Sequence, residues 1–412
     1  MNRVCVIGSG IFGIAAVREI LRTVPGCRLD WVSADTVAGG LWSAPARDGL
    51  MYDSLHLNTS RERSAFSGTT IPGRPTVHFV HHARYAEYLA GIAAECAGAE
   101  RHWGCRVLSV VEQPGGGWSV RWSTGDGGTE ERRYAAVVDA TGHNAVPRGP
   151  DVPIAGDAAY EISHSAEYSS PDLYRGRNLL VVGGGASAVD IACDLVPFAA
   201  TVGISVRTPA WYLPKMFLGR PIDRSAGGGW RGVPLLGRLT DRVAEQVVRR
   251  VVGSYRSYGL ADPVRPLAMS APVLSDHFLA HLGHGRITAY PAVTALEQTS
   301  VRFADGAAEK FDAVITATGF TARSGHLPPA VRDVLSTGRL GLDVEAAAAP
   351  RLFLMNRFRC ADAAVRCAEV QAAAVAAAVR NPRPARTRGS GATGSGTRVT
   401  ASVLRKAYAG YR

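Results

Sequence analysis

A glycine-rich turn between an apolar strand and a helix occurs twice in this chain. The second copy places Gly183, Gly185 and Ala188 in a G-x-G-x-x-[GA] pattern, directly after the apolar residues 179–182. Gly183 allows the tight turn because it has no Cβ, and Gly185 lets a phosphate approach the backbone. Ala188 keeps the following helix close to its strand, and the free N–H groups at the helix start attract an anion. This pattern predicts a dinucleotide-binding unit.

The first copy of the motif lies close to Met1, with Gly8, Gly10 and Gly13 after the apolar residues 4–7. The two copies are about 175 residues apart, which predicts two dinucleotides bound by one chain.

The strand predicted over 28–33 ends where such units usually carry an acidic residue that binds a ribose hydroxyl. Here that place falls on Ser33, and Asp35 follows two residues later.

The order of the predicted elements indicates an α/β protein. The predicted strands over 133–140 and 311–317 both end in Ala-Thr-Gly, at 140–142 and 317–319. The predicted helices are 11–23, 82–97, 187–196, 239–252, 273–282 and 361–380. We expect two Rossmann-like domains, with the second, 165–305, inserted into the first, 1–164 and 306–380.

The formal net charge of +11 suggests nucleic-acid binding at first sight. Seven basic residues and no acidic ones lie within 381–412, which leaves +4 for the rest of the chain. The segment 381–412 is rich in Gly, Ser, Arg and Pro, so we expect a disordered basic tail and no nucleic-acid partner.

The composition predicts a cytoplasmic protein. The first strand begins at Arg3, which leaves no room for a signal peptide, and no segment has the pattern of a membrane span. The cysteines form no CxxC motif, so we expect reduced, unpaired thiols at positions 5, 27, 96, 105, 193, 360 and 367.

Across residues 3–380 the chain resembles the flavin-containing monooxygenases, which are class B flavoprotein monooxygenases. The resemblance rests on the joint order and spacing of several short motifs. These are the two glycine motifs, 39–42 (GGLW), 57–62 (LNTSRE), 140–142 (ATG), 164–168 (HSAEY), 205–207 (SVR) and 317–320 (ATGF).

The resemblance implies FAD in the first domain and NADPH in the second. In the family, NADPH reduces the flavin, and O₂ then forms a C4a-(hydro)peroxyflavin. One oxygen atom passes to a soft nucleophile of a small molecule, an amine nitrogen in N-hydroxylation or a sulfide sulfur in S-oxidation. The cofactor supplies the chemistry, and the protein orients it and excludes water.

Residue by residue, the resemblance implies that Asn58 lies beside the flavin and acts in catalysis. No metal is expected, and a homodimer is left open. The residues expected to bind cofactor are Gly8, Gly10, Gly13, Ser33, Gly40, Leu41, Trp42, Asn58, Val107, Thr141, Gly142, Gly183, Gly185, Ser187, Ala188, Arg207, Thr318 and Gly319.

The chain departs from the family pattern at one fingerprint, Phe-x-Gly-x-x-x-His, whose first two places fall on Ala158 and Tyr160. His164 and Tyr168 remain. Baeyer–Villiger oxygenation of a ketone is an alternative, although its fingerprint prefers Trp at the place of Tyr168. An uncoupled NADPH oxidase or a non-catalytic flavin-binding protein is a further alternative. The cysteine positions exclude a disulfide oxidoreductase.

Overall fold

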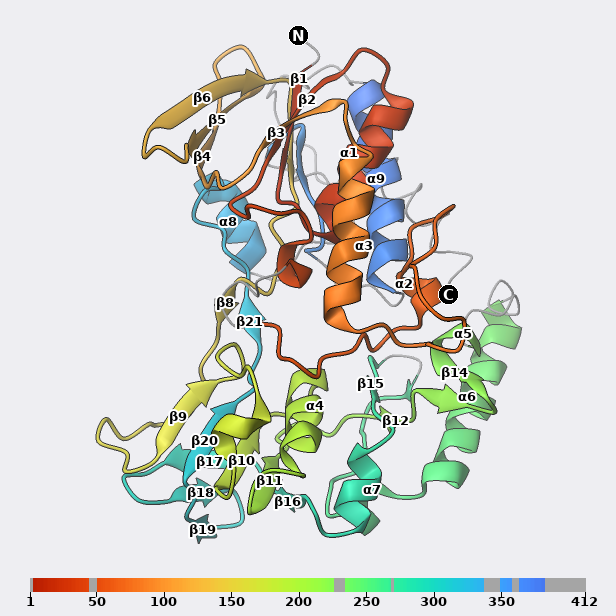
Figure 1. Cartoon of the computed structure of the whole chain (residues 1–412), viewed down its shortest axis with the longest axis vertical. Coiled ribbons are helices and arrows are strands. Elements are labelled where there is room, and N and C mark those ends of the chain that lie inside the picture. The colour runs from red at the N-terminus through yellow and green to blue at the C-terminus, as the bar shows by residue number, and fades with distance from the viewer. Residues whose placement is uncertain are drawn as a thin grey trace, which may run out of the picture.

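Strands of small apolar residues form the centre of each of two domains (Figure 1). The computed structural model describes residues 3–43, 50–225, 234–267, 270–336, 349–357 and 363–381. Within these ranges, each domain contains one five-stranded parallel sheet with helices packed on it. The predicted α/β fold of two Rossmann-like domains is therefore confirmed.

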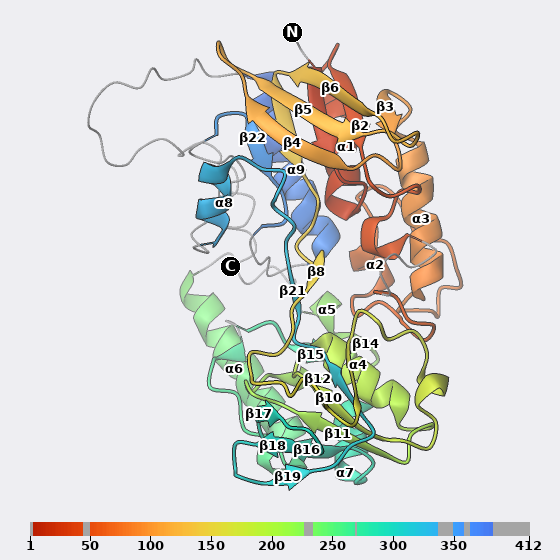
Figure 2. The same cartoon turned by 90° about the vertical axis from the view of Figure 1, so that its left-hand side faces the viewer.

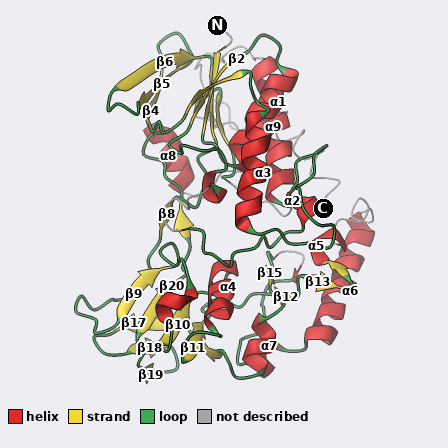
Figure 3. Ribbon diagram, in the orientation of Figure 1, coloured by secondary structure: helices red, strands yellow, loops and turns green. Residues whose placement is uncertain are grey.

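The first sheet has the strand order β22-β7-β1-β2-β3. Its strands are β1 (Arg3–Ile7), β2 (Arg28–Val32), β3 (Ala99–His102), β7 (Ala136–Asp139) and β22 (Leu352–Leu354). Val4 and Val6 pack on the face covered by helices, whereas Cys5 and Ile7 alternate to the other face. The helices on the first face, side by side in Figure 3, are α1 (Ile11–Thr23), α3 (His82–Ala94) and α9 (Ala364–Arg380).

The other face of the first sheet is covered by a small antiparallel sheet and helix α8 (Figure 2). Trp118 and Trp122 are fully buried there. The elements are β4 (Val107–Glu112), β5 (Trp118–Ser123), β6 (Thr129–Tyr134) and α8 (Pro329–Ser336). Two short helices, η1 (Gly40–Trp42) and α2 (Arg61–Ser64), complete the domain.

The second sheet has the strand order β16-β11-β10-β20-β9. Its strands are β9 (Glu161–His164), β10 (Asn178–Val182), β11 (Thr201–Ser205), β16 (Thr288–Tyr290) and β20 (Ala313–Thr316). Leu179 and Val181 pack beneath α4 (Ala186–Leu195) and α7 (Phe278–Gly283). Leu180 and Val182 face the antiparallel strands β17 (Val293–Leu296), β18 (Val301–Phe303) and β19 (Ala308–Glu309).

Several short elements and one long helix, α6, surround the second sheet. They are η3 (Pro171–Tyr174), β12 (Tyr212–Leu213), β13 (Met216–Phe217), β14 (Arg220–Pro221), α5 (Ile222–Ser225), α6 (Pro234–Val252), η4 (Tyr255–Tyr258) and β15 (Val273–Leu274).

Two chain crossings join the domains. Strand β8 (Val146–Pro147) leads into the second domain and pairs antiparallel with β21 (Phe320–Thr321), which leads back (Figure 2). In addition, Tyr52 and Leu55 from the loop before α2 pack into the core of the second domain.

The strand pairing in the second sheet corrects the predicted domain boundaries at 164 and 306. Strand β9 pairs with β20, and β20 pairs with β10, so both belong to the second sheet. The boundaries drawn on the sequence were wrong at these two strands, because a short buried apolar strand has the same pattern in either sheet. The return of β22 and α9 to the first domain agrees with the predicted insertion.

Some elements also differ from the prediction. The region 133–140 contains a break between β6 and β7, and the predicted helix 273–282 divides into β15 and the shorter α7. Strand β3 was not predicted, since its exposed residues Glu100 and Arg101 interrupt any apolar pattern. The predicted tail beyond Asn381 lies outside the described residues.

The thiols were predicted to be unpaired. Cys5, Cys27, Cys96, Cys105 and Cys193 are free, but Cys367 in α9 is disulfide-bonded, so the prediction is wrong there. Pairing depends on distance in space, which sequence spacing alone does not give. Cys360 lies outside the described residues.

Among the helices of the described ranges, none combines the length and the apolar character needed to cross a membrane.

Candidate functional site

The first glycine motif forms a tight turn at the carboxyl end of β1. Gly8 has a φ of +102°, and its N–H donates to the carbonyl of Val32 over 2.8 Å. A Cβ on Gly8 would lie 2.6 Å from the carbonyl oxygen of Ala140, and one on Gly13 would lie 1.9 Å from that of Gly8. Glycine is therefore required at both positions, since neither backbone oxygen can move away.

The loop at 39–42 lies against this turn. Gly39 donates to the carbonyl of Ser9 over 2.9 Å, and a Cβ on Gly40 would lie 2.7 Å from the Cα of Gly10. The loop continues through Leu41, which is exposed, into Trp42, which contacts the ring of Tyr85 edge-on at 5.1 Å. The structure thus brings the predicted residues Gly10, Gly40, Leu41 and Trp42 together.

Asp35, shortly after the end of β2, supplies the carboxylate that Ser33 lacks. The Asp35 Oδ2 accepts from Ser9 at 3.2 Å and from Ser33 at 3.3 Å, while the two serine hydroxyls are 2.9 Å apart. An adenosine ribose bound at such a motif needs an acceptor at this place. Asp35 was not in the predicted set, although its position two residues after the strand was a usable signal.

Beside Gly8, the turn Ala140-Thr141-Gly142 is held by a buried arginine. Arg357 is 2 % exposed; it donates to the Gly142 carbonyl over 2.9 Å and to the Thr141 hydroxyl over 2.9 Å, and it pairs with Asp139 at 2.5 Å. Burial raises the pKa of Asp139, but the charges of Arg357 and His326 outweigh it and hold that pKa well below the usual range. Arg357 was missed from the sequence; the signal was Asp139 itself, an acid that ends a buried strand.

The second glycine motif repeats the geometry of the first. Gly183 has a φ of +149°, and a Cβ there would lie 2.5 Å from the carbonyl oxygen of Ala317 and 3.2 Å from the Ala188 Cβ. Gly185 caps the start of α4, has open space where a Cβ would be, and is exposed, as is Ser187. The free N–H groups of this helix start are therefore accessible to an anion.

The second Ala-Thr-Gly turn joins the crossing strands. The backbone N–H of Arg148 donates to the Gly319 carbonyl over 3.0 Å, and its guanidinium donates to the Thr318 carbonyl over 3.1 Å. The Nδ1 of His164 accepts from the Ala166 N–H, so its Nε2 carries the proton and donates to Gly319 over 3.1 Å. Burial lowers the pKa of His164, which favours this neutral form.

Arg207 lies just beyond β11, and its side chain is exposed. The neighbouring residues 206–209 contain no acidic side chain. A guanidinium at this place suits a 2′-phosphate, whereas a carboxylate would repel it.

Asn58 lies between the two domains. Its Nδ2 donates to the Asp190 Oδ2 of α4 over 3.2 Å, and its Oδ1 is buried without a hydrogen-bond partner. The structure therefore brings Asn58 to the helix that follows the second glycine motif. Asp190 was not predicted.

Val107 belongs to a different environment. It starts β4 and packs with Val32 and Cys105 on the face of the first sheet opposite to α1. The two altered fingerprint positions are structural: Ala158 packs in the core behind β10, and Tyr160 donates to the Ser300 carbonyl over 3.2 Å. The retained Tyr168 donates to Asp194 over 2.7 Å.

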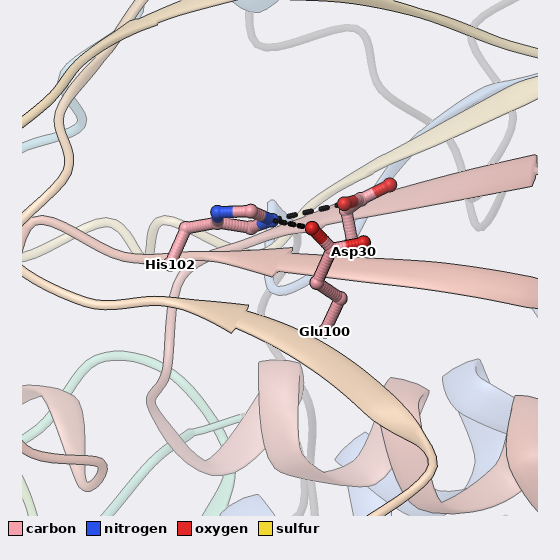
Figure 4. Close-up of side chains that lie close together, drawn as sticks. All are labelled: Asp30, Glu100 and His102. Atoms are coloured by element: carbon pink, nitrogen blue, oxygen red, sulfur yellow. Dashed lines mark hydrogen bonds and ion pairs between the residues drawn. The ribbon is translucent and has the colours of Figure 1, made fainter.

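One cluster of potential metal ligands, Asp30, Glu100 and His102, lies at the edge of the first sheet (Figure 4). The His102 Nε2 is 2.9 Å from Asp30. Both carboxylates also accept from Arg3 and Arg132, so protein cations already neutralise them. Burial raises the pKa of Asp30, but the bonds from His102 and Arg3 lower it further than burial raises it. We assign this cluster a structural role.

Both glycine turns fit the diphosphate of a dinucleotide. At Gly10 a Cβ would meet only the Cα of Gly40 at 3.7 Å, and at Gly185 it would meet nothing within 4 Å. The missing side chains thus leave room in front of two helix starts, as FAD and NADPH require.

Comparison with known proteins agrees with this geometry. Residues 1–337 match the family model described as flavin-binding monooxygenase-like. The rat protein "Dimethylaniline monooxygenase [N-oxide-forming] 2" is 30% identical over 336 residues, which are 78% of this chain and 62% of that protein. The rice (Oryza sativa subsp. japonica) "Indole-3-pyruvate monooxygenase YUCCA1" is 30% identical over 323 residues, 76% of each. The chain thus spans less than two thirds of the rat relative.

Solved structures share the fold. A flavin-containing monooxygenase from Stenotrophomonas maltophilia aligns with a TM-score of 0.65 at 22% identity, covering 92% of this chain and 99% of that one. Closed cyclohexanone monooxygenase aligns with a TM-score of 0.68 at 17% identity, covering 92% and 84%. The chain belongs to the flavin-binding monooxygenase-like family, whose members are FAD- and NADPH-dependent monooxygenases.

Proposed function

We propose that this chain uses NADPH and O₂ to transfer one oxygen atom to the amine nitrogen or sulfide sulfur of a small molecule. The second oxygen atom leaves as water, and NADPH is oxidised to NADP⁺. The observation that carries the proposal is the pair of matched glycine turns, one per domain, with the Asn58 amide between the domains. The rat relative is named as N-oxide-forming, which supports nitrogen as the acceptor.

In this proposal FAD occupies the first domain. Its diphosphate lies at Gly8, Gly10 and Gly13, and Asp35 accepts from its ribose. NADPH occupies the second domain, with its diphosphate at Gly185. When bound, the flavin supplies the activation of oxygen, and the protein orients the partners and excludes water.

Arg207 is proposed to select NADPH over NADH. Arg207→Ala should raise the KM for NADPH about 10- to 100-fold, because one charge-assisted contact contributes about 1.5–3 kcal/mol. The KM for NADH should change little, which makes NADH the internal control in steady-state assays. Equal use of both donors by the parent protein would contradict this role.

Asn58 is proposed to act at the site of oxygen transfer. Asn58→Ala should keep FAD binding and flavin reduction by NADPH, but lose about 10²-fold in product formed per NADPH, because one preorganised polar contact contributes about 3 kcal/mol. Hydrogen peroxide should appear instead. Product and peroxide are measured together under steady turnover.

A matched control for this variant is Asn178→Ala. Asn178 stands at the amino end of β10, where it accepts from Thr201 on the surface. This variant should form product as the parent does. Normal product yield from Asn58→Ala would show that Asn58 is only a loop residue.

The substrate class is tested by supplying a tertiary amine, a thioether or a cyclic ketone with NADPH and isotopically labelled O₂. We expect labelled N-oxide or S-oxide in the mass spectrum. The ketone is included because cyclohexanone monooxygenase has the same fold. If lactone is the only product, the ketone replaces the amine or sulfide as the acceptor. If peroxide is the only product, oxygen transfer is contradicted.

A further inference from the structure

One hydrogen bond across the domain junction determines how the Asn58 amide is oriented. The Nδ2 of Asn58, in the loop before α2, donates to the Oδ2 of Asp190 over 3.2 Å. Asp190 lies five residues after Gly185, in the second turn of α4. Helix α4 of the second domain therefore contacts Asn58, the residue that the proposed reaction uses.

The contact can hold only one orientation of the amide. In its ionised form the Asp190 carboxylate accepts but cannot donate, so the NH₂ group of Asn58 then faces it, as the hydrogen bond shows. Rotating the amide would place its carbonyl oxygen against the carboxylate oxygen. The Oδ1 of Asn58 is consequently directed away from Asp190, and it is buried without a partner. An unpaired buried acceptor of this kind is costly unless a ligand group donates to it.

Asp190 is itself held in place. Tyr52 is 7% exposed, comes from the same loop as Asn58, and interacts electrostatically with Asp190. Tyr52 also contacts the ring of Tyr168 edge-on at 5.4 Å, within the core of the second domain. Burial raises the pKa of Asp190, and the bond from Asn58 and the charge of Lys215 oppose that rise. The pair is thus mutually dependent, since the amide also stabilises the carboxylate.

We propose that Asp190 is a positioning residue, which fixes the Asn58 amide so that its buried oxygen is directed away from α4 and left for a ligand donor. This inference rests on the proposed function, because it states how Asn58 becomes effective there. A donor on the bound nicotinamide nucleotide or reduced flavin would pair with the oriented Oδ1. Loss of Asp190 should leave both cofactors bound but free the amide to rotate.

The test is a double-mutant cycle with Asn58→Ala, Asp190→Ala and the double variant, all as FAD-loaded protein. Product per NADPH should fall about 10-fold or more in Asp190→Ala, and no further in the double variant than in Asn58→Ala alone. Anaerobic flavin reduction by NADPH should stay within about twofold of the parent. Asp194→Asn is the control: it lies one turn further along α4 and bonds Tyr168 rather than Asn58, so its effect should add to that of Asn58→Ala.

The same double-mutant cycle, measured by urea unfolding, tests the contact between Asn58 and Asp190 independently of enzymatic activity. The unfolding equilibrium constants should be non-additive by about threefold or more. Additive unfolding effects would mean that no bond joins the pair and would overturn the inference. Coupled unfolding with normal product yield in Asp190→Ala would overturn the positioning role. If the parent reduces its flavin but forms no product, the proposed function fails, and additivity or coupling in urea still decides whether Asp190 holds the amide.

Discussion

A Gly185→Val variant is expected to keep its bound FAD and lose NADPH, and Gly10→Val is expected to lose FAD. The physical reason is steric. Each valine side chain would fill the space in front of a helix start, where the N–H groups are accessible to a diphosphate. Losing two charge-assisted hydrogen bonds, at about 1.5–3 kcal/mol each, weakens binding by about 100-fold or more. FAD is measured by absorbance of the purified protein, and NADPH binding by equilibrium dialysis, which does not need bound flavin.

The two variants separate binding from folding because both positions have room. A Cβ at Gly185 meets no atom within 4 Å, and one at Gly10 meets only Gly40 at 3.7 Å. The control is Gly156→Val, which also adds a side chain in open space but lies outside both motifs. It should bind both cofactors. If Gly185→Val lost FAD and kept NADPH, the cofactor assignment of the two domains would be reversed.

The glycine turns could be predicted from the sequence because their backbone geometry excludes other residues. Gly8 and Gly183 have positive φ, and in both domains a Cβ would collide with the carbonyl of the alanine in Ala-Thr-Gly. The same physical requirement thus appears twice in the chain, at 140–142 and at 317–319. Such local constraints are readable without a structure.

Two of the missed site residues, Asp190 and Arg357, depend on distant parts of the chain. Asp190 meets Asn58 across 132 positions, and Arg357 meets Asp139 across 218. An acid that ends a buried strand, such as Asp139, indicates that a partner is needed, but no local pattern tells which distant residue supplies it. The boundary error at β20 has the same origin: the apolar segment was recognised, but the sheet that it joins depends on its neighbours in space.

Arg357→Leu is expected to cause the largest loss of stability among the substitutions considered. Arg357 and Asp139 are 2% and 0% exposed, and removing one partner of a buried ion pair costs about 3–5 kcal/mol. The expected measurement is a urea unfolding midpoint well below that of the parent. Arg22→Leu breaks the exposed pair with Glu19 and should leave the midpoint nearly unchanged.

The pH dependence distinguishes this mechanism from a simple packing defect. In the parent, the pKa of Asp139 lies below its usual range, so the ion pair's stabilisation is present above about pH 4 and is lost as the pH falls further. Without Arg357, only His326 opposes the effect of burial, so we expect the pKa of Asp139 to rise above its usual value. The folded state then binds the proton more tightly than the unfolded state, so stability should fall as the pH rises from about 5 to 7. Adding Asp139→Asn removes the buried charge, so the double variant should be more stable at pH 7 than Arg357→Leu alone. If the single variant instead loses the same stability at both pH values, Arg357 contributes through packing, and the buried charge of Asp139 does not need it.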